Sequence, residues 1–132
     1  MTSLLLDTHA FIWFAMGDSK HMPAATADLI KNPSRDVYVS SVSIWEIATK
    51  SRLGKLLGVN DIVKRPNYFL SELSMMALPI TVEHASKAGS FDSPHRDPFD
   101  RMLAAQSLIE NLGLVSVDDT FAVFGIQRIW LI

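Results

Sequence analysis

The sequence has 132 residues, a length that fits one folded domain because independent domains usually contain about 50 to 200 residues. Hydrophobic residues make up 48% of the chain and charged residues 20%, and this balance excludes a disordered chain. A net charge of −2, from 12 basic and 14 acidic residues, excludes a polycationic coat for nucleic acid, and zero cysteines exclude disulfides and thiolate metal sites.

Short apolar runs alternate along the chain with stretches of helical spacing, without repeats or low-complexity segments. The apolar runs predict five strands, at residues 4–6, 37–39, 77–80, 114–117 and 129–131. The helical spacing predicts helices between them, at residues 11–15, 23–32, 42–53, 61–76 with a break at Pro66, 82–88, 98–112 and 120–124. The clearest helix has Asp97 at its cap, Pro98 at its first position and Gly113 at its end.

This alternation is typical of βαβ units. It predicts an α/β fold in which a twisted parallel sheet of about five strands has helices on both faces, within a single domain of residues 1–132. Asp7 and His9 interrupt the apolar start and no basic residue precedes them, so we expect no export signal. No apolar run approaches the roughly 20 residues that span a bilayer. We therefore expect a cytoplasmic protein without a membrane segment, which the absence of cysteine also fits.

Four carboxylates stand at positions that suggest a shared site. Asp7 and Asp118 each come directly after an apolar strand. Because ligands bind at the carboxyl ends of the strands in an open parallel sheet, both side chains are expected in that site. Glu46 lies within an otherwise apolar helix face, and Asp100 lies in the first turn of the clearest predicted helix. Folding is expected to bring all four to one edge of the sheet.

Each acid also has a purely structural interpretation. Asp7 and Asp118 could cap the helices that follow them. Glu46 could complete a capping box with Ser43 or pair with Lys50, and the fourth acid could favour the positive end of its helix. These alternatives do not explain why two acids end two hydrophobic strands while a third interrupts an apolar helix face. The pattern as a whole therefore favours a shared site.

A cluster of carboxylates indicates a metal site, because the negative charges repel one another unless a cation joins them. Oxygen ligands favour a hard ion, Mg²⁺ or Mn²⁺, over zinc. The four histidines show no paired ligand spacing, and none is assigned to the metal. An ion held in this way activates water for in-line attack on a phosphodiester, so the acids predict a metal-dependent nuclease.

Five segments carry a resemblance to a known family: residues 6–10 (LDTHA), 43–50 (SIWEIATK), 54–56 (GKL), 95–101 (HRDPFDR) and 114–121 (LVSVDDTF). Together they resemble a PIN-domain protein and, more narrowly, a VapC-type toxin of a bacterial type II toxin–antitoxin pair. The resemblance covers essentially the whole chain. It implies a PIN fold, Mg²⁺- or Mn²⁺-dependent endoribonuclease activity on RNA, a homodimer, and inhibition by a small VapB-like antitoxin.

The resemblance also implies roles for individual acids. Asp7, Glu46, Asp100 and Asp118 match the family's acidic quartet and are expected to be catalytic and to bind the metal. Asp100 is preferred to its neighbour Asp97 because the residues that follow it fit the family pattern, whereas Asp97 already fits a cap before a proline. Asp97 therefore stays open as a further member of the site.

Two positions beside Asp118 complete this comparison. Ser116 stands where family members often have threonine, and its hydroxyl could hydrogen-bond a water at the metal or the Asp118 side chain. Asp119 stays open as a further acidic member of the site. The antitoxin could insert an arginine into the carboxylate pocket, where a guanidinium would replace the charge of the metal.

The charge distribution predicts where RNA would bind. Residues 50–65 contain five basic side chains and one acid, a local surplus of +4. Lys50, Arg52 and Lys55 are predicted to contact phosphates beside the acidic pocket, with an ordinary solvated face as an equal alternative. Arg101 could contact a phosphate or form an internal ion pair.

Aromatic residues near these motifs are predicted to be structural. Trp45 and Phe11 lie among apolar neighbours in the sequence, so both are expected in the core rather than as platforms for RNA bases. His9 could touch substrate or lie on a helix surface.

The predicted reaction is attack of a water on the scissile phosphate, and the resemblance implies a 5′-phosphate product. Glu46 could ligate the metal through water or accept the proton of the attacking water. The main alternative is a non-catalytic PIN-like module that binds RNA or a partner. A phosphotransfer domain with Asp7 as the acceptor is disfavoured, because the sequence lacks the second acid that such patterns require.

Overall fold

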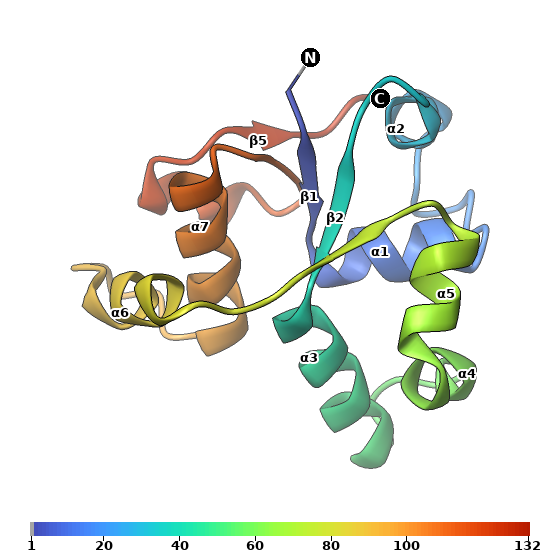
Figure 1. Cartoon of the computed structure of the whole chain (residues 1–132), viewed down its shortest axis with the longest axis horizontal. Coiled ribbons are helices and arrows are strands. Elements are labelled where there is room, and N and C mark those ends of the chain that lie inside the picture. The colour runs from blue at the N-terminus through green and yellow to red at the C-terminus, as the bar shows by residue number, and fades with distance from the viewer. Residues whose placement is uncertain (1) are drawn as a thin grey trace.

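The computed structural model describes residues 2–132 (Figure 1). Its strands are β1 (Leu4–Leu6), β2 (Val37–Ser40), β3 (Met76–Leu78), β4 (Gly113–Val115) and β5 (Arg128–Ile129). Its helices are α1 (Thr8–Ala15), α2 (Ala24–Lys31), α3 (Ser41–Arg52), α4 (Asn60–Lys64), α5 (Pro66–Glu72), α6 (Val82–Ser90), α7 (Pro98–Glu110) and the 3₁₀ helix η1 (Asp119–Phe124). The five predicted strands are therefore all present, and Pro66 separates two helices as expected.

All five strands form one parallel sheet in the order β3-β2-β1-β4-β5. The prediction of a parallel α/β fold is confirmed. The chain builds the sheet outward from β1 to β3 on one side and then returns to place β4 and β5 on the other. The order of the strands thus reverses between β1 and β4, and ligands in such sheets bind in the crevice at this switch point.

Helices cover both faces of the sheet, also as predicted. The side chains of β1 alternate between two hydrophobic cores: Leu4 and Leu6 join one, and Leu5 joins the other. The first core includes Phe11 of α1 and residues of α3, α4 and α5, whereas the second includes Leu103 of α7. Figure 1 shows α1, α4 and α5 on one side of β1 and β2, with α6 and α7 on the other.

The end of α7 differs from the prediction that Gly113 terminates this helix. Asn111 caps the helix in the left-handed conformation, with φ 55°, and Gly113 is already the first residue of β4. A Cβ atom on Gly113 would lie 2.5 Å from Cδ1 of Ile129 on the neighbouring strand. The glycine therefore leaves room for the end of the Ile129 side chain and does not form the helix end.

The prediction that Trp45 lies in the core is wrong, whereas Phe11 is fully buried as expected. The Trp45 side chain is 59% exposed, and its ring contacts Phe99 edge-on at a centroid distance of 5.0 Å. The reason is helical phase, because α3 buries Val42, Ser43, Glu46 and Ile47, and residue 45 points away from that stripe.

The helices of residues 2–132 are too short or too polar to cross a membrane.

Candidate active site

The four predicted acids line one pocket of about 200 Å³. Asp7 follows β1 and Asp118 follows β4 by three residues, so both lie at the switch point of the sheet. Glu46 comes from α3, and Asp100 comes from the first turn of α7. The complete lining consists of Asp7, Thr8, His9, Glu46, Lys50, Asp97, Asp100, Val117, Asp118 and Phe121. Asp97, which the sequence left open, therefore belongs to the pocket, and Asp119 is not among its lining residues.

Asp7 serves the helix and the pocket together. Its Oδ1 accepts a hydrogen bond of 2.8 Å from the backbone N–H of Ala10, which caps α1. The side chain is almost fully buried, and burial raises the pKa of its carboxyl, while a hydrogen bond from the Ser116 hydroxyl acts in the opposite direction. The capping interpretation is therefore correct and does not exclude a role in the pocket.

Both oxygens of Glu46 have donors. The Thr8 hydroxyl donates to Oε1 at 2.6 Å, and Lys50 Nζ lies 2.5 Å from Oε2. The Lys50 pairing considered from the sequence is present, but the capping box with Ser43 is not, because Ser40 caps α3. The Ser43 hydroxyl instead lies 3.0 Å from that of Thr8. Thr8 and Lys50 thus hold the buried Glu46 carboxylate directly, and Ser43 contacts Thr8 behind it.

Asp100 is a second acid of the pocket whose pKa is raised. Burial is the main cause that raises the pKa of Asp100 to about 6, and the negative charges of Asp97 and Glu46 add to it. A hydrogen bond from His95, with Nε2 3.0 Å from Oδ2, opposes this rise. Asp97 itself caps α7 by accepting from the backbone N–H groups of Phe99 and Asp100.

Asp118 is the most accessible member of the quartet. Its Oδ1 accepts from the backbone N–H of Thr120 at 2.9 Å and from the Thr120 hydroxyl at 2.6 Å, and these bonds cap η1. The Thr120 hydroxyl is the main cause that holds the pKa of Asp118 below its usual value. Ser116 is fully buried, and its hydroxyl accepts from the backbone N–H of Asp118 at 3.0 Å.

The chemistry of this donor set fits a hard divalent cation, because five carboxylates, the four predicted acids and Asp97, supply oxygen ligands and excess negative charge at one pocket. The present arrangement is not a closed coordination shell: within residues 2–132, no group of three acidic, histidine or cysteine side chains is placed to hold one ion. Glu46 faces Lys50, and Asp100 faces His95. A metal must therefore compete with Lys50 for Oε2 of Glu46, whereas the His95 bond to Oδ2 of Asp100 leaves Oδ1 of that carboxylate for the ion.

The residues predicted to bind substrate are dispersed. Lys50 lines the pocket, whereas Arg52 and Lys55 are exposed at the end of α3 and in the following turn, outside the lining. Arg101 directs its guanidinium to backbone carbonyls, including those of Ala88 and His95 at 2.8 Å each. This placement favours an internal role for Arg101 over the phosphate contact, and its partners are backbone carbonyls rather than the acid of the alternative ion pair.

Thr8 and His95 are the polar residues that sequence reasoning left without a role in this site. Thr8 follows Asp7 at the end of a strand, and that position is a usable signal, because side chains after a buried strand point into the crevice. His95 lies in a loop without periodicity, so its contact with Asp100 has no counterpart in the sequence pattern.

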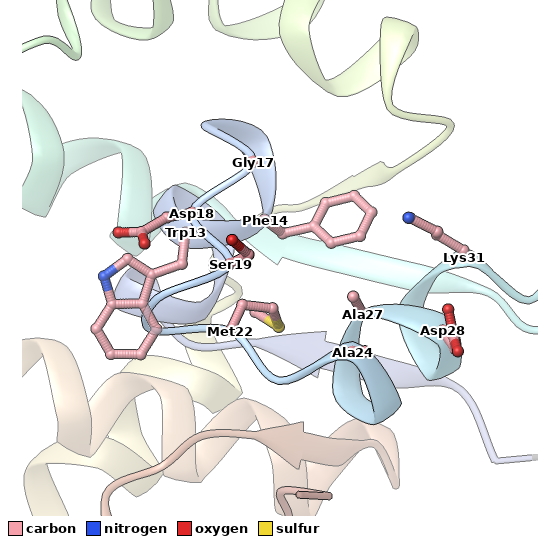
Figure 2. Close-up of a pocket in the computed structure, with 10 residues that line it drawn as sticks. All are labelled: Trp13, Phe14, Gly17, Asp18, Ser19, Met22, Ala24, Ala27, Asp28 and Lys31. Carbon is pink, nitrogen blue, oxygen red and sulfur yellow. The ribbon is translucent and has the colours of Figure 1, made fainter.

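A second cavity of about 390 Å³ lies between α1 and α2, and Figure 2 shows the apolar side chains of Trp13, Phe14 and Met22 at its wall. Its lining shares no residue with the acidic pocket. Asp18 at this cavity accepts from the ring of His21 at 2.7 Å. This cavity has two carboxylates, Asp18 and Asp28, beside Lys31, whereas five carboxylates meet in the acidic pocket. The acidic pocket is therefore the candidate active site.

A family model for the PIN domain matches residues 4–126. The chain belongs to the PIN domain family. This finding confirms the family resemblance inferred from the sequence, and it agrees with the parallel five-stranded sheet of the PIN-domain chain. A comparison with curated proteins finds no significant match.

Solved structures similar to this PIN-domain chain include toxins of toxin–antitoxin systems. FitAcB from Neisseria gonorrhoeae shares 18% identity over 95% of each chain, with a TM-score of 0.65. VapBC2 from Rickettsia felis, bound to a DNA fragment from its promoter, shares 15% over 97% of this chain and 98% of that chain, with a TM-score of 0.68. VapC20 from Mycobacterium tuberculosis, a Sarcin-Ricin loop cleaving toxin, shares 19% sequence identity over 98% of this chain and 100% of that chain, with a TM-score of 0.67. At these identities the likeness establishes the shared fold.

Proposed function

We propose that this PIN-domain chain is a Mg²⁺- or Mn²⁺-dependent endoribonuclease and the toxin of a type II toxin–antitoxin pair. The observation that carries the proposal is the meeting of Asp7, Glu46, Asp100 and Asp118 in one pocket at the switch point of the sheet. The similar structures support the class, since one is a toxin that cleaves the Sarcin-Ricin loop. The fold alone would not support it, because one fold serves many functions.

The four carboxylates are the residues that would hold the metal. When bound, a divalent cation supplies the charge that lowers the pKa of water and stabilises negative charge on the leaving oxygen. Ser116 and Ala10 orient Asp7, and Thr8 orients Glu46, so two of the acids are already held in place.

Hydrolysis requires the oxygen of a water to bond to phosphorus while the bond from phosphorus to O3′ breaks, which leaves a 5′-phosphate and a 3′-hydroxyl. Glu46 has two roles open to it: its Oε2 accepts a proton from the attacking water, or it helps to hold the ion through water. Lys50 borders the same oxygen of Glu46 and is the cation best placed to meet a substrate phosphate in the pocket.

The test is cleavage of RNA by the purified chain in the presence of Mn²⁺. We expect EDTA to abolish cleavage and Asp100→Asn to reduce it by at least a hundredfold, because both changes remove part of the metal site. Cleavage that survives both treatments would contradict the role of the metal and the carboxylates. Brief induction in cells, followed by mapping of RNA ends, would identify the target.

We further propose a small VapB-like antitoxin as a partner, a homodimer as the assembly, and the cytoplasm as the location. Two of the similar structures are FitAB and VapBC complexes bound to DNA, and these support the antitoxin. Expression of the chain alone is expected to arrest growth, and co-expression with the neighbouring small gene to relieve the arrest. Absence of arrest, or arrest that the small gene does not relieve, would contradict this assignment.

The second candidate is a PIN-like module that binds RNA or a partner without cleaving. The observation that favours it is the arrangement of the acids, since within residues 2–132 no three potential ligands are placed around one ion. RNA binding without any Mn²⁺-dependent cleavage would support this candidate.

A further inference from the structure

Arg101 is engaged by the backbone at all of its donor groups. Nε donates to the carbonyl of Ala88 at 2.8 Å, and Nη1 donates to the carbonyls of His95 at 2.8 Å and Ser93 at 3.3 Å. Nη2 donates to the carbonyls of Phe91 at 2.7 Å and Gly89 at 3.5 Å. A guanidinium has five N–H groups, and here five carbonyls accept them. Arg101 therefore has no donor left for a phosphate in this structure.

These carbonyls belong to the end of α6 and to residues 91–97, which lead to α7 without helix or strand structure. The last carbonyls of a helix lack partners within the helix, and a cation near them is favourable. The guanidinium also lies 5.8 Å from the ring of Phe91. The half-buried Arg101 side chain thus hydrogen-bonds both the end of α6 and the loop that follows it.

The loop carries His95 to the active site. The backbone of His95 is held by Arg101, while its Nε2 lies 3.0 Å from Oδ2 of Asp100. An ionised carboxylate only accepts, so Nε2 carries the hydrogen of this bond. The ring of His95 also meets Phe124 edge-on at a centroid distance of 5.4 Å. Arg101 thus contacts the backbone of His95, Phe124 contacts its ring, and Asp100 contacts its Nε2.

We propose that Arg101 is a positioning residue of the active site: it shapes residues 91–97 so that His95 holds the Asp100 carboxylate in the pocket. The inference rests on the proposed nuclease function and replaces the phosphate contact considered from the sequence. Lysine cannot substitute for it, because a single ammonium group cannot reach carbonyls spread along eight residues of backbone.

The first experiment measures kcat and KM for RNA cleavage in Arg101→Lys, which keeps the charge. We expect kcat to fall by about 10- to 100-fold, the loss usual when the support of a metal ligand is removed, and KM to stay within twofold. Arg96→Lys is the matched control, because Arg96 is an exposed arginine of the same loop, and it is expected to keep the wild-type kcat. A raised KM with unchanged kcat in Arg101→Lys would overturn the proposal in favour of a phosphate contact.

A double-mutant cycle separates positioning from general damage to the fold. If Arg101 acts through His95, then Arg101→Lys is expected to lower kcat by less than twofold in a His95→Ala background. A kcat of the double variant that is reduced by the product of the two single-variant losses would contradict the proposal. His95→Ala alone also tests it if Arg101→Lys fails to fold, since an unchanged kcat in that variant would overturn it.

The His95 ring in the metal-free protein gives a readout that does not depend on activity. We expect NMR of the ring nitrogens to show hydrogen at Nε2 in the wild type, and loss of that fixed signal in Arg101→Lys. An unchanged His95 signal would overturn the positioning role whether or not the protein cleaves RNA. Failure of the proposed function would instead appear in the wild type, as absence of Mn²⁺-dependent cleavage.

Discussion

Lys50 Nζ lies 2.5 Å from Oε2 of Glu46, inside a pocket that three further members of the acidic quartet line. The pair lies one helical turn apart on α3, so the sequence itself places a cation beside Glu46, the one acid of that helix. Lys50 therefore supplies part of the positive charge that the pocket needs when no metal is bound. The same ammonium must compete with a metal for Glu46.

Removal of this charge by Lys50→Met should have opposite effects on the free and the metal-bound protein. Without metal, Glu46 loses its ionic partner, and the free energy of unfolding should fall by about 1 to 3 kcal/mol. With Mn²⁺, the variant lacks the repulsion between the Lys50 ammonium and the ion, so its affinity for Mn²⁺ should rise by roughly tenfold, equivalent to about 1.4 kcal/mol. Urea unfolding in EDTA and calorimetric titration with Mn²⁺ measure the two effects.

Lys55→Met is the matched control for this experiment, because Lys55 is an exposed lysine outside the pocket. It is expected to change neither quantity by more than about 0.5 kcal/mol. Weaker Mn²⁺ binding in Lys50→Met would show that Lys50 supports the metal site rather than competing with it.

The raised pKa of Asp100 predicts how stability depends on pH. Burial raises this pKa from 3.8 to about 6, so between these values the folded protein binds a proton that the unfolded chain releases. The contribution of Asp100 to the free energy of unfolding of the metal-free protein should therefore be greatest below pH 4 and decrease as the pH rises to 6. With allowance for the partial exposure of Asp100, the loss should be about 1 to 2 kcal/mol.

Urea unfolding at pH 4 and pH 7, in EDTA, measures this loss. Asp100→Asn should reduce the slope and leave the part contributed by Asp7, whose pKa burial also raises. Asp92→Asn, at an exposed position in the neighbouring loop, should retain the full slope. An equal slope in the wild type and Asp100→Asn would assign the pH dependence to another group. Metal binding requires the ionised carboxylate, so Mn²⁺ affinity is expected to weaken below pH 6.

The sequence was sufficient to predict the sheet and the meeting of Asp7 with Asp118, because both depend on short-range patterns. Three leucines before Asp7 predict a strand that is buried on both faces. An acid that follows such a strand lies at the crevice at the carboxyl end of the sheet when the strand is central, as β1 is. Parallel pairing of β1 with β4 then places Asp7 and Asp118 at the same end of the sheet. Neither step requires knowledge of a loop.

Loop-dependent contacts could not be predicted in the same way. The bonds from Arg101 to five carbonyls depend on the path of residues 91–97, which have neither helical nor strand periodicity. Charge alone therefore suggested a phosphate ligand, and only the backbone path shows the internal acceptors. Trp45 was misplaced for a related reason, because a short apolar run on a helix does not show where the buried stripe ends.

The exposed position of Trp45 predicts a small effect on stability. Trp45→Ala should lower the free energy of unfolding by about 1 kcal/mol, since the ring is mostly in solvent and loses mainly its edge contact with Phe99. Phe11→Ala, at a fully buried position, should cost about 3 to 5 kcal/mol. Urea unfolding compares the two variants, and equal losses would mean that Trp45 is covered in solution.

The close approach of β4 and β5 predicts that Gly113→Ala is destabilising. Its new Cβ would lie 2.5 Å from Cδ1 at the end of the Ile129 side chain, so that side chain must turn away, at a cost of about 0.5 to 1.5 kcal/mol. Ile129→Val in the same chain should recover part of this loss, because it removes the atom that clashes. Gly89→Ala is the matched control: a Cβ there meets no atom within 4 Å, and alanine in α6 should stabilise the protein by up to about 1 kcal/mol. Equal unfolding energies for the two alanine variants would show that β5 does not hold Ile129 against Gly113.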